Sequence, residues 1–228
     1  MYKHFFKRIF DIVSSGMALV VLSPILLYVA YLVKTRLGSP VLFTQVRPGK
    51  DGRLFRMYKF RSMTDERDAE GKLLPDDVRL TDFGKKLRAT SLDELPELLN
   101  IFKGDMSVVG PRPQLVRDMV FFTEEEMQRQ SVYPGLTGLA QICGRNNITW
   151  KEKFAFDLQY IKNISFLEDM RIIYRTVFKV SAQEDIATDG METAEDYGDW
   201  LLRTGQISKY EYDRKQEEAK RMLEEYEG

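Results

Sequence analysis

The chain has 228 residues, of which 43% are hydrophobic and 30% are charged, so it can bury one substantial core, with or without an appendage. Its single cysteine, Cys143, excludes an internal disulfide and a multi-cysteine metal site. Its single histidine, His4, lies near the N-terminus, which argues against a Ser-His-Asp triad and a histidine-ligated zinc in the body of the chain. An enzyme of this composition would depend on carboxylates, lysines and arginines, helped by an oxygen-binding metal such as Mg²⁺.

The net charge of -1 hides an uneven distribution. Residues 187–228 hold twelve Asp or Glu against six Lys or Arg, which leaves a charge of about +5 for residues 1–186. A basic body fits nucleic acid, an anionic membrane surface or phosphorylated substrates. Because the chain has no zinc-finger spacing, RNA-binding aromatic motif or basic leucine zipper, we expect no nucleic-acid partner.

Residues 12–33 contain no charged side chain and are rich in Val, Leu, Ile and Ala. A helix of this length could span a bilayer, but Ser23 and Pro24 lie in its middle, where proline removes a helical hydrogen bond and predicts a break. Ser23 could bond the freed carbonyl. Because basic residues flank both ends, both ends favour the cytoplasmic side. We therefore expect residues 1–36 to form a re-entrant membrane hairpin of helix, break and helix, with a kinked crossing helix as the alternative. The flanking basic residues are Lys3, Lys7, Arg8, Lys34 and Arg36.

Residues 37–186 form the predicted body, which combines a little β-structure with several helices. Strand-like runs at 41–45 and 54–58 flank a turn-rich segment, which is typical of a β-hairpin. A charged segment at 67–77, punctuated by Gly and Pro, predicts a surface loop. The fold class is therefore α/β: mostly α, with a short β-hairpin or small sheet. Helical periodicity covers 82–88, 92–102, 115–130, 150–161 and 166–180.

The last helix of the body is amphipathic. Arg171, Arg175 and Lys179 recur at intervals of four and form a cationic side, and apolar residues occupy the other side. The helix is either a solvated helix over a core or an interfacial helix that rests on lipid, and the sequence leaves both readings open.

Residues 187–228 predict an acidic helical appendage. Helix starts near Thr193 and Ser208, separated at Gly205, indicate two short helices. The appendage could cover the body, mediate self-association into a homo-oligomer, or have no catalytic role.

The run at residues 88–113 carries the strongest chemical signal. Ser91 to Glu94 fit a capping box, in which a serine caps a helix and a glutamate three residues later caps back, and Pro96 also favours a helix start there. The same residues place adjacent carboxylates, Asp93 and Glu94, where free backbone N–H groups attract anions. Arg88 and Arg112 flank them and could bind phosphate oxygens as forks. The structural and functional readings are compatible, because a cap would set the helix end that presents Asp93 to phosphate.

Together with the membrane hairpin, several motifs make the chain resemble the bacterial sugar transferases called monotopic phosphoglycosyl transferases. The resemblance covers about residues 2–180, and the small members of that family are of similar size. The motifs are Lys7-Arg8-Ile9-Phe10-Asp11, Ser23-Pro24, Phe43-Thr44-Gln45-Val46-Arg47-Pro48-Gly49, Tyr58-Lys59-Phe60-Arg61-Ser62-Met63, Ser91-Leu92-Asp93-Glu94-Leu95-Pro96, Lys103-Gly104-Asp105-Met106-Ser107-Val108-Val109-Gly110-Pro111-Arg112-Pro113, and Pro134-Gly135-Leu136-Thr137-Gly138 leading to Gly144-Arg145-Asn146.

This resemblance implies transfer of a phosphosugar from a UDP-sugar to polyprenyl (undecaprenyl) phosphate at the cytoplasmic face of the bacterial plasma membrane. The products would be polyprenyl diphosphate sugar and UMP. The family uses an Asp-Glu dyad and Mg²⁺, which implies that Asp93 is the nucleophile and a metal ligand and that an aspartyl phosphosugar forms. Residues 37–186 would then be the cytoplasmic catalytic domain, with membrane lipids as further partners.

Residue chemistry suggests the remaining roles. Glu94 is better suited to accept a proton or to position a group than to act as a second nucleophile, since adjacent helical residues point about 100° apart. Arg88, Arg112 and Arg145 are candidates for binding substrate phosphate. Lys59 is a weaker candidate, because it could instead pair with Asp169.

Two departures from the family pattern are visible. Cys143 stands where the family more often has a small polar residue before Gly-Arg, and the tail beyond about Ile186 matches nothing in that pattern. Two other functions stay open from sequence alone: a non-enzymatic membrane scaffold, and a hydrolase of diphosphate substrates.

Overall fold

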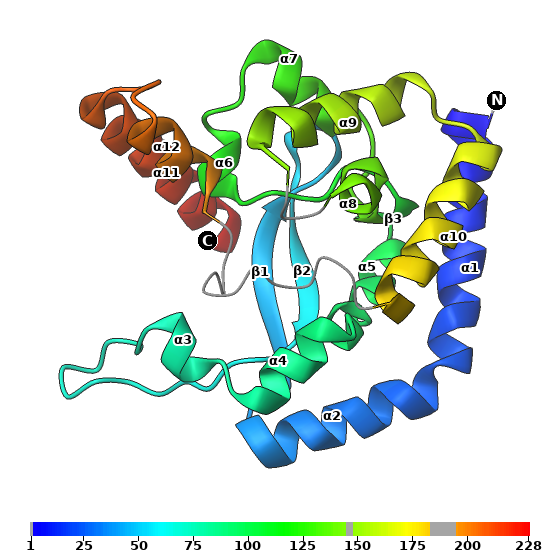
Figure 1. The fold of residues 1–228 in the computed structure, drawn as a ribbon, viewed down its shortest axis with the longest axis horizontal. Coiled ribbons are helices and arrows are strands. Elements are labelled where there is room, and N and C mark those ends of the chain that lie inside the picture. The colour runs from blue at the N-terminus through cyan, green and yellow to red at the C-terminus, as the bar shows by residue number, and fades with distance from the viewer. Residues whose placement is uncertain (1, 145–147, 183–194) are drawn as a thin grey trace.

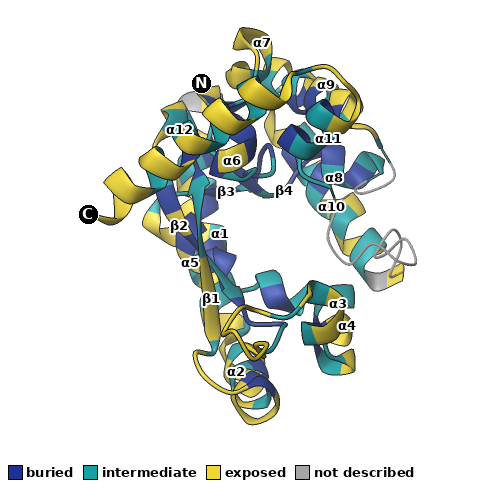
Figure 2. Cartoon of the chain, turned by 90° about the vertical axis from the view of Figure 1, so that its left-hand side faces the viewer, coloured by how far each residue is buried: buried dark blue, intermediate teal, exposed yellow. Residues whose placement is uncertain are grey.

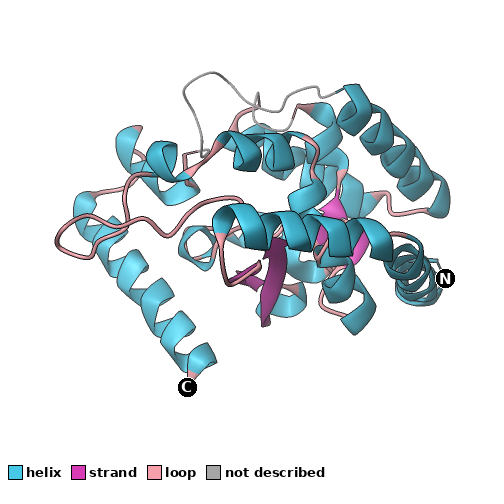
Figure 3. Cartoon of the chain, turned by 90° about the horizontal axis from the view of Figure 1, so that it is seen from below, coloured by secondary structure: helices cyan, strands magenta, loops and turns pink. Residues whose placement is uncertain are grey.

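A computed structural model describes residues 2–144, 148–182 and 195–228. Figure 1 shows helices α1 and α2 as an L along the right side and the lower edge, around a central β-hairpin. A group of helices lies at the top, and the C-terminal helices α11 and α12 lie on the left, opposite α1. Seen from below, the strands lie between helices (Figure 3). The predicted class, mostly helical with a little β-structure, is confirmed.

The N-terminal arm begins with a π-helix (Tyr2–Phe6) and continues as α1 (Lys7–Val21) and α2 (Ser23–Leu37). The two helices meet at 64°, and the Ser23 hydroxyl donates to the Val20 carbonyl at 2.7 Å. The predicted break at Ser23-Pro24 is therefore confirmed, with Pro24 in the first turn of α2, where no N–H is needed.

The arm packs on the body by one side only. Ala18 and Leu19 of α1 contact the core formed with Leu98 and Ile101, while large apolar residues on the opposite side stay exposed. Of the helices described, none alone is long and apolar enough to cross a membrane, but the bent pair meets the length and composition required. The exposed apolar residues include Phe5, Ile9, Val13, Met17, Val20, Val21, Leu27, Tyr28 and Tyr31.

Two small sheets organise the body. Strands β1 (Leu42–Pro48) and β2 (Leu54–Phe60) form the predicted antiparallel hairpin, with Leu42 opposite Phe60. Both strands extend two or more residues beyond the prediction. Strands β3 (Ser107–Val109) and β4 (Gly135–Thr137) form a short parallel pair that the sequence analysis did not predict.

Between β2 and β3 the chain forms α3 (Asp76–Arg79), α4 (Asp82–Ala89), a 3₁₀ turn (Leu92–Glu94) and α5 (Glu97–Lys103). The surface loop predicted at 67–77 is confirmed as far as residue 75 and carries one bridge, but Asp76 and Asp77 begin α3. The predicted capping box is wrong, and the predicted helix at 92–102 starts later. Ser91 has φ 54° and its side chain caps nothing, so the α-helix begins only after Pro96.

The helix predicted at 115–130 is also wrong as a single element. It is divided into α6 (Val116–Met119), α7 (Glu124–Met127) and a 3₁₀ turn (Gln128–Ser131). Thr123 forms a capping box with Glu126, which starts a new helix instead of continuing the old one. The next helices are α8 (Leu139–Cys143), α9 (Trp150–Lys162) and α10 (Phe166–Ala182).

Helix α10 has two apolar sides. Ile172 is completely buried in the core with Tyr160, whereas Tyr174, Val177 and Phe178 are exposed. This pattern leaves an apolar surface beside the cationic residues and keeps the interfacial reading of the helix open.

The C-terminal appendage comprises α11 (Tyr197–Arg203) and α12 (Lys209–Glu227). Ser208 caps α12 as predicted, and Gly205, with φ 70°, separates the two helices. Ala219 is buried against Val116, and Figure 2 shows exposed residues along the outer side of α12. The appendage therefore covers α6; its other predicted start, at Thr193, lies outside the described residues.

Candidate active site

Helix α5 is fixed to β2 by one buried amide. Asn100 accepts a hydrogen bond from the Tyr58 N–H at 3.0 Å and donates to the Arg56 carbonyl at 2.8 Å and to the Asp105 carboxylate at 3.1 Å. Asn100 is fully buried, so these bonds satisfy groups that could not reach water. The Asn100 hydrogen bonds fix α5 against β2 and so set the distance from Lys59 on β2 to Glu94 and Glu97, which lie just before and at the start of α5.

Lys59 joins two of these carboxylates. Its ammonium lies 2.8 Å from Glu94 Oε1 and 3.2 Å from Glu97 Oε1. The alternative considered for Lys59, a pairing with Asp169, is therefore not the one formed. Asp169 lies in α10 and instead binds Lys7 of α1 at 2.6 Å, because α10 packs beside α1 and not beside β2.

Arg112 binds the same oxygen of Glu94. Its guanidinium donates to Glu94 Oε1 at 2.7 Å. The turn that carries Arg112 is fixed by the close approach of two backbones: Gly110 donates to Thr137 O at 2.9 Å, and Gly135 donates to Pro111 O at 2.9 Å. A side chain on Gly110 would place Cβ 2.4 Å from the Tyr133 carbonyl, so the turn requires glycine there.

The two members of the dyad differ sharply in their surroundings. Burial alone would raise the pKa of Glu94, but Arg112 and Lys59 hold it well below its usual range. Asp93 is 8% exposed, and no residue that the structure describes forms a hydrogen bond or ion pair with its carboxylate. Burial and the neighbouring Glu94 charge raise the pKa of Asp93 to about 6, an effect reduced by Lys59, Arg88 and Arg112. Of the two carboxylates, Glu94 is therefore the one held by ion pairs, with Lys59 and Arg112.

Arg88 lies at the end of α4, where its Nε donates to Ser62 Oγ at 2.9 Å. The structure thus brings together Lys59, Arg88 and Arg112 around the dyad. The fourth phosphate-binding candidate, Arg145, lies outside the described residues.

Glu97 is a site residue that the sequence analysis missed. It is 1% exposed, and burial raises its pKa to about 7 despite the nearby Lys59. Its position three residues after Glu94 places it on the same side of the chain, toward β2, which is the one signal the sequence carries for it.

Within the described residues, no group of three or more His, Cys, Asp or Glu is arranged to hold a metal ion. Helix α5 has seven residues, so its terminus offers little of the expected anion attraction. Positive charge at the dyad therefore comes from side chains.

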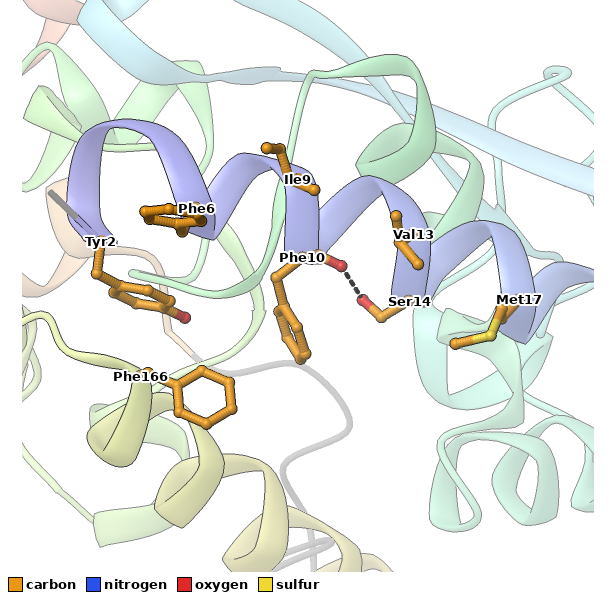
Figure 4. Close-up of a pocket in the computed structure, with 8 residues that line it drawn as sticks. All are labelled: Tyr2, Phe6, Ile9, Phe10, Val13, Ser14, Met17 and Phe166. Carbon is orange, nitrogen blue, oxygen red and sulfur yellow. Dashed lines mark hydrogen bonds between the residues drawn. The ribbon is translucent and has the colours of Figure 1, made fainter.

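An apolar cavity of about 490 Å³ lies away from this cluster, between α1 and the first turn of α10. Figure 4 shows Phe10 and Met17 of α1 and Phe166 of α10 among the side chains that line it. None of the predicted catalytic or phosphate-binding residues belongs to it.

Known proteins are similar to this chain over most of its length. The bacterial sugar transferase family matches residues 2–183. The uncharacterized sugar transferase EpsL of Bacillus subtilis is 50% identical over 189 residues, which cover 83% of this chain and 94% of that protein. The UDP-glucose:undecaprenyl-phosphate glucose-1-phosphate transferase of Klebsiella pneumoniae is 44% identical over 187 residues, and the undecaprenyl-phosphate galactose phosphotransferase of Salmonella typhimurium is 38% identical over 198 residues.

The chain is similar to these proteins over different shares of their length. The match covers 76% of this chain and 40% of the Klebsiella protein, and 79% of this chain and 41% of the Salmonella protein. The matched residues 2–183 include both members of the dyad and the three described cations around it. The chain is therefore a transferase that belongs to the bacterial sugar transferase family.

Proposed function

We propose that the protein transfers a sugar 1-phosphate from a UDP-sugar to undecaprenyl phosphate through a covalent intermediate on Asp93. The observation that carries this proposal is the contrast within the dyad: Asp93 is buried and unpaired among the described residues, while Glu94 is held by Lys59 and Arg112. The reaction agrees with the printed names of the Klebsiella and Salmonella relatives.

In the first step, Asp93 Oδ attacks the phosphorus that carries the sugar. A carboxylate–phosphorus bond forms, the bond from that phosphorus to the oxygen bridging to UMP breaks, and UMP leaves with the bond's electron pair. In the second step, a phosphate oxygen of the lipid attacks the same phosphorus and displaces the Asp93 carboxylate. Atoms and charge balance without an external oxidant or reductant, and no proton must move to form either bond.

The surrounding charges suit this chemistry. A carboxylate approaches an anionic diphosphate against repulsion, so nearby cations are needed to lower the barrier. Lys59 and Arg112 are held in place by Glu94, and Arg88 by Ser62, so these cations are oriented before substrate arrives. Glu94 accordingly acts as a positioning group, because both neighbours already occupy its Oε1 atom.

The residues present also fit Mg²⁺. This ion is usually bound by one or two carboxylates together with substrate phosphates, and Asp93 supplies a carboxylate that no described residue occupies. Bound there, Mg²⁺ would neutralise charge on the diphosphate. The proposed Mg²⁺ site therefore depends on substrate for the remaining ligands.

The lipid substrate implies that the protein works at a membrane. The exposed apolar side chains of α1, α2 and α10 provide a surface for this. Lysine and arginine residues flank the apolar stretch of the arm at both ends, so both ends favour the cytoplasmic side. We place the arm as a re-entrant hairpin in the cytoplasmic leaflet of the bacterial plasma membrane.

The hairpin predicts one pattern of cysteine labelling. In a Cys143→Ser background, Lys3→Cys and Ser39→Cys lie at the two ends of the arm. In intact spheroplasts, a membrane-impermeant maleimide should label neither variant, and after permeabilisation it should label both. Labelling of Lys3→Cys from outside would instead show a crossing helix.

The activity is tested with purified protein, Mg²⁺, undecaprenyl phosphate and a panel of UDP-sugars, by measuring UMP. Turnover of UMP should require the lipid, and without it UMP should stop at one equivalent per enzyme. Continuous UMP release without lipid would indicate a hydrolase. No UMP with any sugar, from protein shown to be folded, would favour a membrane scaffold.

A further inference from the structure

The C-terminal appendage is fixed to the body at α6. Buried Asp118 accepts hydrogen bonds from the backbone N–H groups of Tyr197, at 2.8 Å, and Gly198, at 3.4 Å. It thereby satisfies free donors at the start of α11. Arg117 forms an ion pair with Asp196 beside them. The family match ends at residue 183, so this contact joins the family's body to a segment outside it.

Tyr197 continues the contact into an aromatic cluster. Its ring centroid lies 5.0 Å from that of Phe154 in an edge-to-face arrangement and 5.9 Å from that of Phe122. Phe122 and Phe154 themselves lie 5.1 Å apart. Such pairs add specific geometry to the burial of apolar area, so α11 restricts the positions of both phenylalanines.

These phenylalanines hold a buried arginine. The guanidinium of Arg129, a residue only 4% exposed, lies 5.4 Å from the ring centroid of Phe122 and 5.4 Å from that of Phe154. Arg129 also pairs with Asp157 at 2.7 Å. A cation that contacts two rings and pairs with a carboxylate has little freedom to move.

Arg129 ends this chain of contacts at the proposed phosphate site. Its Nη2 donates to the backbone carbonyl of Arg112 at 2.8 Å, and the Arg112 side chain binds Glu94. This hydrogen bond fixes the backbone of Arg112. The two residues before it, Gly110 and Pro111, are fixed instead by backbone hydrogen bonds to β4.

We propose that Arg129 is a positioning residue for Arg112 and that the appendage of residues 195–228 holds Arg129 in place through Phe122 and Phe154. The appendage thus supports binding of the nucleotide diphosphate without touching it. This inference rests on the role proposed above for Arg112 in binding phosphate.

Two variants break the connection at different points. Arg129→Lys keeps the positive charge next to Asp157 but lacks the fork that also reaches the Arg112 carbonyl. Gly198→Ala would place Cβ 2.6 Å from the Phe121 ring and push the start of α11 away from Asp118. Tyr210→Ser is the matched control, because Tyr210 lies on α12 and is 79% exposed.

The test measures the dissociation constant of UDP by calorimetry for each variant, alone and combined with Arg112→Ala. Arg129→Lys and Gly198→Ala should each weaken UDP binding about three- to tenfold, by loss of one oriented charged contact. In the Arg112→Ala background each should change the constant less than twofold, because the residue they act through is gone. Tyr210→Ser should have no effect.

Equal losses in both backgrounds would show general destabilisation and overturn the inference, as would unchanged affinity of Arg129→Lys. A wild-type protein that does not bind UDP would also overturn it, because Arg112 would then hold no phosphate. UMP release is measured in parallel: the expected affinity pattern without UMP release would remove the proposed transfer reaction and leave the positioning role in place.

Discussion

Asp93→Asn should abolish turnover, with a loss of kcat of at least about 10⁴-fold, because an amide oxygen cannot form the phosphoryl bond that the reaction requires. In metal-free buffer, binding of UDP should weaken little, since Lys59, Arg112 and Arg88 are held by Glu94 and Ser62 and not by Asp93. The measurement is the rate of UMP release at saturating UDP-sugar and lipid. Activity within tenfold of wild type would remove Asp93 as the nucleophile.

The same variant should stabilise the protein in metal-free buffer. The pKa of folded Asp93 is raised to about 6 from 3.8, so the folded state holds its proton more tightly than the unfolded state does. Ionised Asp93 therefore costs stability, and this cost develops as the pH rises from about 4 to above 6, to a limit of about 3 kcal/mol. Melting temperatures of wild type and Asp93→Asn should coincide near pH 4 and diverge by pH 8, with the variant higher.

Arg112→Ala should produce the second largest loss, about 10²- to 10³-fold in kcat/KM. Such values are typical when one oriented cation or donor is removed from a developing negative charge. Arg112→Lys should recover only part of the loss, because a lysine cannot bind Glu94 and a phosphate as a planar fork.

Arg56→Ala is the control for this prediction, because Arg56 is an exposed arginine on β2, three residues before Lys59. The kinetic constants of this variant should match those of wild type. If Arg56→Ala and Arg112→Ala lose activity equally, the effect reflects general positive charge and not the position of Arg112.

Local chemistry made parts of the fold predictable from sequence. The break at Pro24 follows from a missing N–H, and the β1–β2 hairpin follows from a turn-rich segment between two alternating runs. The start of α12 follows from the capping serine, Ser208. In each case neighbouring residues alone decide the conformation.

The dyad shows where such reasoning fails. Ser91 to Glu94 have the sequence of a capping box, but Lys59 and Arg112 bind the Glu94 carboxylate, which is then not available to cap back. Both partners are distant in sequence, so the local pattern could not reveal the competition. The prediction that Arg88 and Arg112 lie around Asp93 and Glu94 came from their positions in the 88–113 run, and the structure places both arginines near Asp93.

Glu97 and Arg129 were missed for a related reason. Each is an ordinary charged residue in sequence, and its significance comes from burial: Glu97 is 1% and Arg129 4% exposed. Burial of these groups depends on β2 for Glu97 and on Phe122 and Phe154 for Arg129. Sequence periodicity does not encode contacts between such distant elements.

The central claim, a covalent phosphosugar on Asp93, is tested most directly by the mass of the intact protein. Wild-type protein is incubated with Mg²⁺ and a UDP-sugar that supports turnover, without lipid, then quenched and analysed by mass spectrometry, with peptide mapping of the product. The protein should gain the mass of one sugar phosphate on the peptide that contains Asp93, lose it on addition of undecaprenyl phosphate, and gain nothing as Asp93→Asn. An active enzyme that never acquires this mass, or that acquires it equally in Asp93→Asn, would contradict the account.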